Sequence, residues 1–270
     1  MKNLLDFLDD ILQSWANKKI LLFLDYDGTL APIASVPSQA VCPKENRELI
    51  ERLSQIAHYQ VVIIGGRPLE DLKQMVSVKN VFYIGNHGWE IESSPLHMES
   101  LISVQAFSVM RRIKHDLTEQ LSSIPGVLLE DKGVTLSVHY RMVSQDKEFQ
   151  VRRIFEHICM PYRRQNMIKV YRGKKVLELR PWVQWDKGKA ALWLLRKQEV
   201  LWGKGNVLPF YIGDDTTDED AFEALRNKGV TVFVGDPKLS RAQYCLPGPQ
   251  DVTELLKHMI YGAYEKLAVK

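Results

Sequence analysis

The sequence predicts an α/β protein in which a parallel sheet is interrupted by a smaller α+β unit. Short, continuously apolar runs at 20–24, 61–64, 81–84 and 208–212 are typical of strands buried on both faces of a parallel sheet. Each run ends in glycine or acidic residues. Between positions 91 and 181 the pattern changes to long helices and alternating strands, and afterwards the first pattern resumes. We therefore expect one core domain with an insertion.

Composition narrows the class of protein. A chain of 270 residues is long enough for two compact units. The 36 Lys and Arg residues are scattered and nearly balance 33 Asp and Glu, which gives no strong field for nucleic acid or an anionic membrane. Cys42, Cys159 and Cys245 are too few and too far apart for a disulfide framework or a zinc site.

The expected location follows from the same features. The first fifteen residues carry several aspartates, unlike a signal peptide, and no apolar run approaches membrane-spanning length. We expect a soluble, cytoplasmic protein that acts on a small molecule, without nucleic acid, membrane or obligate protein partner.

The first buried run leads into a pair of carboxylates. An amphipathic helix is predicted before it, because apolar residues recur there at helical spacing: Leu4, Leu8, Ile11, Leu12 and Trp15. The run then continues into Asp25-Tyr26-Asp27-Gly28-Thr29-Leu30. Ligands and catalytic groups gather at the carboxyl edge of an open α/β sheet, because the loops beyond it converge on one crevice. Gly28 allows a sharp turn; a plain surface turn is the alternative interpretation, since Asp-Gly is a common turn dipeptide.

Two further runs also end in glycine-rich turns. The run 61–64 ends at Gly65-Gly66-Arg67-Pro68, where Pro68 suits the first turn of a following helix. Glycine amides at a helix N-terminus form an anion site. Arg67 is equally compatible with phosphate binding and with a structural ion pair. The run 81–84 stops at Gly85-Asn86-His87-Gly88.

The insertion is predicted to form a small sheet with helices on one face. Its predicted elements are a helix over 99–123, a hairpin over 127–130 and 134–140, a helix over 145–160, and strands over 167–171 and 175–179. Leu136 and Val138 alternate with Ser137 and His139, which predicts one apolar and one polar face. The polar face is either a solvated outer surface or, because the sheet interrupts an active-site fold, part of a lid.

After position 181 the core pattern resumes. Trp185-Asp186-Lys187-Gly188-Lys189 opens a helix, and the run 208–212 ends in the acidic cluster Asp214–Asp220. A strand over 230–234 and a helix over 251–265 complete the core. Taken alone, the acidic cluster is also compatible with a helix N-cap. Taken alone, Lys187 is also compatible with a solvent-exposed side chain at the start of a helix.

Four features therefore share one edge of the sheet: Asp25 with Asp27, the Gly65–Arg67 turn, Lys187, and the acidic cluster. Asp25 and Asp214 together suit Mg²⁺, which takes few protein carboxylates besides phosphate and water. A carboxylate that attacks a phosphate dianion meets charge repulsion, so a metal cation, Lys187 and backbone amides are needed to offset it. Asp27 then delivers a proton to the leaving oxygen. These features predict a phosphoryl-transfer site.

The Asp25–Leu30 motif resembles the first motif of the haloacid dehalogenase superfamily, and most of the chain resembles the trehalose-6-phosphate phosphatases within it. The matching segments are 24–30, 65–68, 85–88, Glu130 with Lys132, 139–141, 177–181, 185–189 and 213–219. The resemblance implies a Rossmann-like haloacid dehalogenase core over 1–90 and 182–270, with an inserted α+β cap domain over 91–181. It also implies Mg²⁺-dependent hydrolysis of trehalose 6-phosphate, in trehalose biosynthesis, through an aspartyl-phosphate.

The same resemblance implies roles for individual residues. Asp25 is the implied nucleophile and Asp27 the acid/base. Both belong to the implied metal site, Asp27 through its backbone carbonyl, together with Asp214, and with Asp218 in the outer shell of the ion. Lys187 is implied to hold the phosphate during catalysis. The implied phosphate-binding residues are Gly65, Gly66, Arg67 and Lys187. The implied sugar-binding residues are His87 in the core and Glu130, Lys132 and Glu178 in the cap.

One position departs from the family pattern. The family usually has Ser or Thr where this chain has Gly65, so a hydroxyl contact to phosphate is missing. We expect the Gly65 and Gly66 amides to replace it.

Three other functions compete with this one. Sibling phosphatases that act on sucrose-phosphate or mannosyl-3-phosphoglycerate share the core chemistry, and only the cap discriminates. A phosphoglucomutase of the superfamily usually places its cap directly after the first motif, where this chain has only a short Pro-rich stretch over 31–43. A catalytically silent sugar-phosphate-binding module is expected to lack Asp25 or Asp27, and both are present.

Overall fold

A computed structural model describes residues 1–14, 18–33, 39–93, 96–98, 104–133, 135–182, 185–237 and 239–268. Parts of four expected segments lie outside these residues: Trp15 of the first helix, 34–38 of the Pro-rich stretch, 99–103 of the first insertion helix, and Val134 of the hairpin. The chain forms two compact units, residues 1–99 with 185–270 and residues 100–184. No helix in the described ranges is long and apolar enough to cross a membrane.

The first unit is built on a nine-stranded sheet in the order β1-β13-β12-β11-β2-β3-β4-β5-β6. The strands are β1 (Lys2–Asn3), β2 (Lys19–Asp25), β3 (Tyr59–Ile64), β4 (Phe82–Gly85), β5 (Glu90–Ser93), β6 (Leu96–Met98), β11 (Val207–Gly213), β12 (Val230–Val234) and β13 (Tyr244–Leu246). All neighbouring strands from β1 to β4 in this order are parallel, and the pairs β4–β5 and β5–β6 are antiparallel. The predicted α/β class with a parallel sheet is confirmed.

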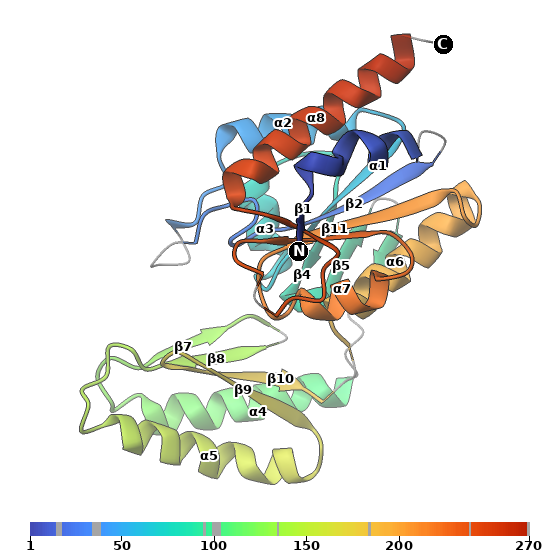
Figure 1. Ribbon diagram of the computed structural model, residues 1–270. Helices are drawn as coiled ribbons and strands as arrows, with labels where there is room; N and C mark the ends of the chain where they lie inside the picture. The colour runs from blue at the N-terminus through green and yellow to red at the C-terminus, as the bar shows by residue number, and fades with distance from the viewer. Residues whose placement is uncertain are drawn as a thin grey trace. The chain divides into compact units, whose positions relative to one another are not determined.

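Helices cover both faces of this sheet (Figure 1). They are η1 (Leu5–Phe7), α1 (Leu8–Ser14), α2 (Lys44–Ser54), α3 (Leu69–Val76), η3 (Asn86–Gly88), α6 (Lys187–Trp202), α7 (Glu219–Leu225) and α8 (Pro249–Ala268). On β2, Leu22 and Leu24 pack in the core shared with α1, α2, α3 and α8, while Leu21 and Phe23 pack in the core shared with α6 and α7. Because both faces are buried, the strand reads as a continuous apolar run.

The sheet of the first unit also contains strands that the sequence pattern did not reveal. The strands β5 and β6 extend it beyond position 90, where the sequence pattern placed the start of the insertion. At the other edge, β1 and β13 are two and three residues long. Strands this short show no detectable alternation of apolar and polar residues, so they are recognised only from their hydrogen-bonded neighbours in the structure.

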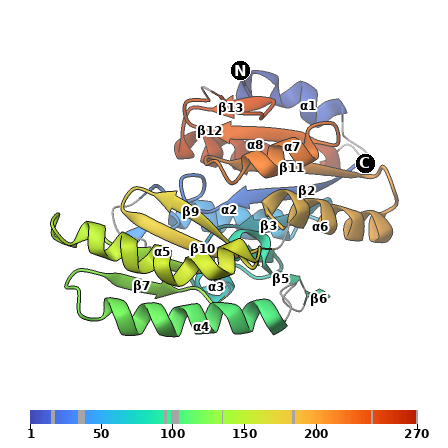
Figure 2. The same ribbon diagram turned by 90° about the horizontal axis from the view of Figure 1, so that it is seen from below.

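The second unit is a four-stranded antiparallel sheet in the order β7-β8-β10-β9. Its elements are α4 (Val104–Leu121), β7 (Leu128–Asp131), β8 (Leu136–His139), α5 (Glu148–Arg164), β9 (Ile168–Gly173) and β10 (Val176–Pro181). Both helices lie on one face of the sheet (Figures 1 and 2). On that face Phe155 belongs to the same buried cluster as Leu136, Val138, Leu177 and Leu179. The predicted apolar face is thus the helix-covered face.

We predict that Phe155→Ala destabilises the second unit by about 3 to 5 kcal/mol, because truncating a fully buried ring leaves a cavity. Phe149→Ala is the matched control, since it lies on the same helix but is 68% exposed and should change stability by no more than about 0.5 kcal/mol. Urea unfolding followed by circular dichroism measures both. Equal losses in the two variants would contradict the packing described here.

Candidate active site

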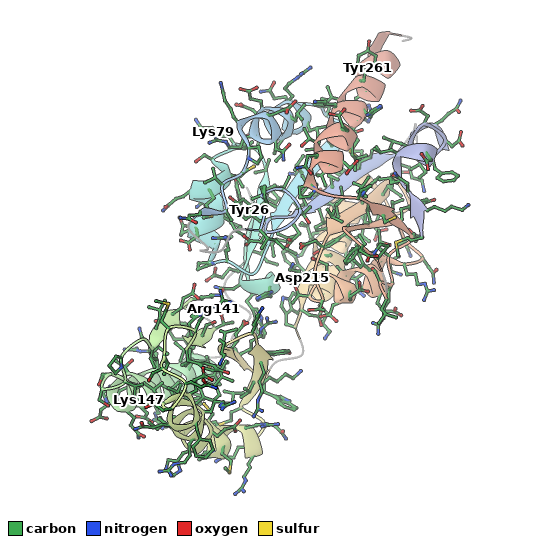
Figure 3. The ribbon with its side chains drawn as sticks, turned by 60° about the vertical axis from the view of Figure 1, so that its left-hand side comes forward. Tyr26, Lys79, Arg141, Lys147, Asp215 and Tyr261 are labelled. Carbon is green, nitrogen blue, oxygen red and sulfur yellow. The ribbon has the colours of Figure 1, made fainter. Side chains whose placement is uncertain are left out.

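Several loops meet at the carboxyl edge of the parallel strands. Asp25 is the last residue of β2, Gly65 directly follows β3, and Asp214 directly follows β11. Because β3, β2 and β11 are parallel neighbours, the three loops leave the sheet side by side. Tyr26 and Asp215, labelled in Figure 3, mark the loops after β2 and β11. The shared sheet edge expected from the sequence is therefore present in the first unit.

A buried lysine links two of these loops to the helix layer. Lys187 is 2% exposed, and its Nζ donates to Asp25 Oδ1 at 2.6 Å and to Asp218 Oδ1 at 2.8 Å. Burial alone would lower the pKa of Lys187, but the Asp218 and Asp25 carboxylates raise it above its ordinary value. The ammonium therefore stays charged beside the carboxylate of Asp25.

The start of α6 is shaped to deliver this lysine. The N-cap Asp186 accepts a hydrogen bond from the Lys189 amide at 2.8 Å, which fixes the first helical turn. A Cβ on Gly188 would lie 2.2 Å from the carbonyl oxygen of Asp220. Only glycine permits this close approach, so the helix start and the acidic loop are held against each other.

Asp218 holds the loop after β11 through hydrogen bonds to its side chain. Its Oδ1 accepts from Lys187 and from the Tyr211 hydroxyl at 2.7 Å, and its Oδ2 accepts from the amides of Asp214 and Asp215, both at 3.1 Å. Four donors thus occupy the four acceptor positions of the carboxylate. Asp218 is suited to holding the loop and the lysine rather than to binding a metal ion directly.

The loop after β2 brings Gly28 against Asp214. Gly28 has a φ of +85°, and a Cβ there would lie 1.9 Å from Asp214 Oδ2. The Thr29 hydroxyl donates to Asp214 Oδ1 at 3.4 Å. The DG dipeptide therefore has two functions: it turns the chain, and it leaves space for the carboxylate of the neighbouring loop.

The carboxylates in this site outnumber the cation beside them. Oxygens of Asp25, Asp214 and Asp218 lie within 4.8 Å of one another, while Lys187 contributes one positive charge. Burial and the Asp218 carboxylate raise the pKa of Asp214 to about 7, and the same two causes raise the pKa of Asp25. A divalent cation would offset the remaining charge with oxygen ligands of the kind that Mg²⁺ prefers, so the residues present fit such an ion.

Asp27 is held by Arg67 in a two-pronged ion pair. Arg67 Nε donates to Asp27 Oδ2 and Arg67 Nη2 donates to Asp27 Oδ1, both at 2.6 Å. The guanidinium also lies over the Tyr26 ring, 5.3 Å from its centroid. Of the two roles that the sequence left open for Arg67, the ion pair is the one that this conformation displays.

The glycine turn after β3 differs from the sequence-based expectation. The Gly65 amide donates to the Ile84 carbonyl at 3.0 Å, so it does not point a hydrogen at a phosphate. Among the described residues, no acceptor is found for the Gly66 amide. We therefore correct the expectation that both amides replace the missing hydroxyl: only Gly66 offers one. His87 lies directly over Gly66, where a Cβ would be 2.4 Å from the imidazole.

The predicted sugar-binding carboxylates of the second unit are aligned across its sheet. Strand register pairs Glu130 with Ser137, Ser137 with Glu178, and Glu178 with Tyr171, which makes one row across all four strands. Cross-strand partners share a face. Because α4 and α5 cover the opposite face, this row stands on the polar face. Ser137, at the centre, is only 2% exposed, so the face is less open there than the alternation predicted.

Each carboxylate in this row has a cationic or imidazole partner. His139 Nε2 lies 2.8 Å from Glu130 Oε2, and this hydrogen bond lowers the pKa of Glu130. Lys132 Nζ is 3.7 Å from the same oxygen. Arg180 Nε donates to Glu178 Oε1 at 2.9 Å. The sequence-predicted residues Glu130, Lys132 and Glu178 are thus fixed in orientation.

Sequence reasoning missed three residues that take part in these arrangements. Tyr211 donates to Asp218, Thr29 donates to Asp214, and Tyr171 stacks against Arg180 at 4.4 Å from ring centroid to guanidinium. Only Thr29 had a local signal, its place in the Asp25–Leu30 motif. The other two are ordinary strand tyrosines until the register of their sheets is known.

Comparisons with known proteins agree with this geometry. A sequence profile of the trehalose-phosphatase family matches residues 23–249. The chain is 36% identical to trehalose 6-phosphate phosphatase RA3 of Zea mays over 93% of this chain and 72% of that protein. It is 33% identical to trehalose-phosphate phosphatase B of Arabidopsis thaliana over 95% of this chain and 70% of that protein. The C-terminal domain of the C. albicans trehalose-6-phosphate phosphatase matches with a TM-score of 0.73 at 26% identity, over 94% of this chain and 96% of that domain.

We predict that Gly28→Ala lowers the free energy of unfolding by about 1 to 3 kcal/mol and displaces Asp214, because a side chain is strained at positive φ and collides with that carboxylate. Gly65→Ala is the matched control. Gly65 does not have a positive φ, and a Cβ there meets its nearest atom, Leu72 Cδ2, at an ordinary 3.4 Å. Thermal unfolding compares them. A Gly28→Ala protein as stable as Gly65→Ala would refute the described turn.

Proposed function

The chain belongs to the trehalose-phosphatase family of hydrolases, and on this premise we propose that it hydrolyses trehalose 6-phosphate to trehalose and phosphate through an aspartyl-phosphate, with Mg²⁺ as cofactor. One observation carries the proposal. The buried Asp25 engages Lys187 through Oδ1 only, and among the described residues no donor occupies its Oδ2. A carboxylate with one oxygen anchored and one available is suited to nucleophilic attack.

In the first step, Asp25 Oδ2 attacks phosphorus while the bond between phosphorus and the sugar oxygen breaks. For this step Asp27 leaves the ion pair with Arg67 and carries a proton, and the sugar oxygen takes that proton, which leaves trehalose and a phosphorylated Asp25. In the second step, Asp27 removes a proton from water, the water oxygen attacks phosphorus, and the bond to Asp25 breaks. Phosphate is released, and both aspartates return to their initial protonation states.

The residues around Asp25 offset the charge of the phosphoryl group. Lys187 supplies a fixed positive charge, and the Gly66 amide supplies a donor. The Tyr211 ring, whose hydroxyl donates to Asp218, stacks on Phe23 at 5.7 Å between ring centroids and meets Phe222 edge-on at 5.7 Å. These packed rings exclude water from the interior side of the site. Mg²⁺, held by Asp25, Asp214 and the Asp27 carbonyl oxygen, would neutralise further phosphoryl charge.

We assign recognition of the sugar to the polar face of the second unit, and His87 is a separate candidate in the first unit. Glu130 and Glu178 present carboxylate oxygens in one row, which suits hydroxyl groups of glucose as hydrogen-bond donors. A phosphate-release assay with trehalose 6-phosphate, sucrose-phosphate, mannosyl-3-phosphoglycerate and glucose 6-phosphate, each with and without Mg²⁺, tests the function. Preference for one of the sibling substrates would change the assignment.

Asp25→Asn is expected to abolish turnover by several orders of magnitude, because an amide does not form the acyl-phosphate. The fold should persist, since Asp218 still pairs with Lys187. Phosphate release and circular dichroism are measured together, with the exposed Asp10→Asn as control. Near-wild-type activity of a sequence-verified Asp25→Asn protein would eliminate Asp25 as nucleophile.

Asp214→Ala is expected to raise the Mg²⁺ concentration needed for half-maximal activity by tenfold or more, since it removes one of few protein oxygens available to the ion. Excess Mg²⁺ should restore part of the activity. The measurement is a Mg²⁺ titration of phosphate release. An unchanged titration curve would place the ion elsewhere.

Glu178→Ala is expected to reduce kcat/KM for trehalose 6-phosphate by tenfold or more, and for p-nitrophenyl phosphate much less, because the small ester needs only the first unit. Glu119→Ala, an exposed substitution on α4, is the control for nonspecific effects. Equal losses on both substrates would argue against a sugar-binding role for Glu178.

A further inference from the structure

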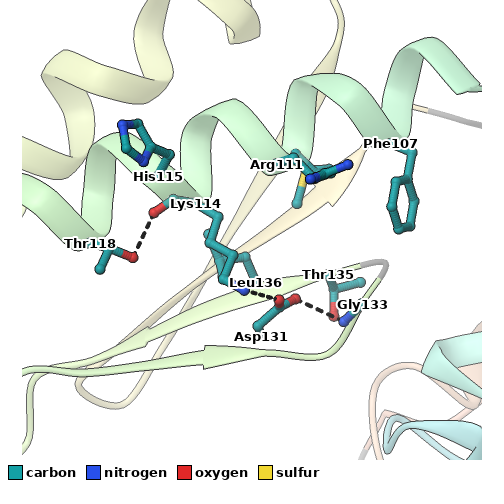
Figure 4. Close-up of a pocket in the computed structure, with 10 residues that line it drawn as sticks. Phe107, Arg111, Lys114, His115, Thr118, Asp131, Gly133, Thr135 and Leu136 are labelled. Carbon is teal, nitrogen blue, oxygen red and sulfur yellow. Dashed lines mark hydrogen bonds and ion pairs between the residues drawn. The ribbon is translucent and has the colours of Figure 1, made fainter.

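A hollow of about 380 Å³ lies within the second unit, between α4 and the hairpin of β7 and β8 (Figure 4). Its volume is within the range of small-molecule sites. The floor is apolar, formed by Met110 and Leu136, and the Phe107 ring, which is 44% exposed, stands at one end. None of the catalytic or sugar-binding residues described above lines it.

The hollow carries a surplus of positive charge. Lys114 Nζ pairs with Asp131 Oδ2 at 2.5 Å and forms one wall. Arg111 lines the same hollow and is exposed, and its guanidinium has no hydrogen bond or ion pair with any described residue. The surrounding segment 100–184 contains 15 Lys and Arg against 8 Asp and Glu, so its field also attracts anions. A free guanidinium beside an aromatic ring suits an anionic group attached to a flat apolar body.

The Lys114–Asp131 ion pair also connects the hollow to the sugar-binding hairpin. Asp131 lies between Glu130 and Lys132 in the chain, and its Oδ1 accepts from the Gly133 amide at 2.9 Å. The same carboxylate therefore fixes the turn and ties the hairpin to α4. An anion placed between Arg111 and Lys114 competes with Asp131 for the lysine, which loosens the turn that positions Glu130 and Lys132.

We propose that this hollow is an effector site for a small organic anion with an aromatic body, and that its occupancy weakens binding of the sugar phosphate. The binding itself is independent of catalysis. The effect on substrate rests on the proposed function.

The binding test uses the full chain and 2-naphthalenesulfonate, which is not a phosphate ester and is not hydrolysed. Calorimetry should detect one site in the wild-type protein. Arg111→Ala should raise the dissociation constant at least about tenfold, because a charge-assisted hydrogen bond is lost. Arg112→Ala is the matched control, since Arg112 is the exposed neighbour that does not line the hollow, and it should bind as the wild type does.

A matched ligand separates charge from apolar contact. The uncharged 2-naphthalenemethanol should bind at least about tenfold more weakly than the sulfonate. No detectable binding of the sulfonate, equal loss in Arg111→Ala and Arg112→Ala, or equal affinity for the alcohol would overturn the site. These outcomes do not depend on any enzymatic activity, so they are distinct from failure of the proposed function.

The regulatory part is tested by kinetics. Saturating sulfonate should raise KM for trehalose 6-phosphate severalfold in the wild type and in Arg112→Ala, but not in Arg111→Ala. Hydrolysis of p-nitrophenyl phosphate should change little. An unchanged KM at an occupied site, or an equal rise in Arg111→Ala, would overturn the coupling to the hairpin.

Discussion

The ammonium of Lys187 is buried between the carboxylates of Asp25 and Asp218, and this ion pair determines how the active site is assembled. An unpaired charge in the interior is too costly to retain, so the buried lysine requires a carboxylate partner, and here it has two. Its two bonds join the end of β2, the start of α6 and the start of α7. The position of Asp25 is therefore set by a charge interaction within the core, while the loop that follows it only completes the turn.

The same group of charges explains why the site suits a divalent cation. Three carboxylates around one ammonium repel one another, which raises the pKa of Asp214 and destabilises the folded protein. Removing any one acid would relieve this repulsion. The oxygens of Asp218 are not available to a metal ion, because they already accept hydrogen bonds from Lys187, Tyr211 and two backbone amides. The uncompensated charge therefore falls on Asp25 and Asp214, which are also the residues that the proposed mechanism brings next to the phosphate.

The sequence predicted the parts of this fold that have a local signature. Strands buried on both faces, such as β2, are continuously apolar, and their carboxyl ends placed Asp25 and Asp214 at one edge. Features that depend on pairing were not accessible. The Gly65 amide looked available for phosphate until its neighbour strand supplied the Ile84 carbonyl, and Tyr211 gained its role only from the loop that folds back onto it. The helix α5 was expected to stop at 160 but runs through Pro161, because its apolar face stays packed against the sheet.

Under the proposed function, the second unit has to present carboxylates to sugar hydroxyls without leaving an unpaired charge. Glu130 is already bonded to His139, and Glu178 to Arg180, before any sugar is present. Each acid keeps oxygen acceptor capacity while a cation lies beside it, Lys132 near Glu130 and Arg180 against Glu178, so binding a sugar on this face would not leave an unpaired charge. The prior pairing also fixes the side-chain rotamers, which reduces the entropy lost on binding. Because these pairs lie on a sheet separate from Lys187 and Asp25, the proposed recognition could vary with residues such as Tyr171 while the charge balance around Lys187 is preserved.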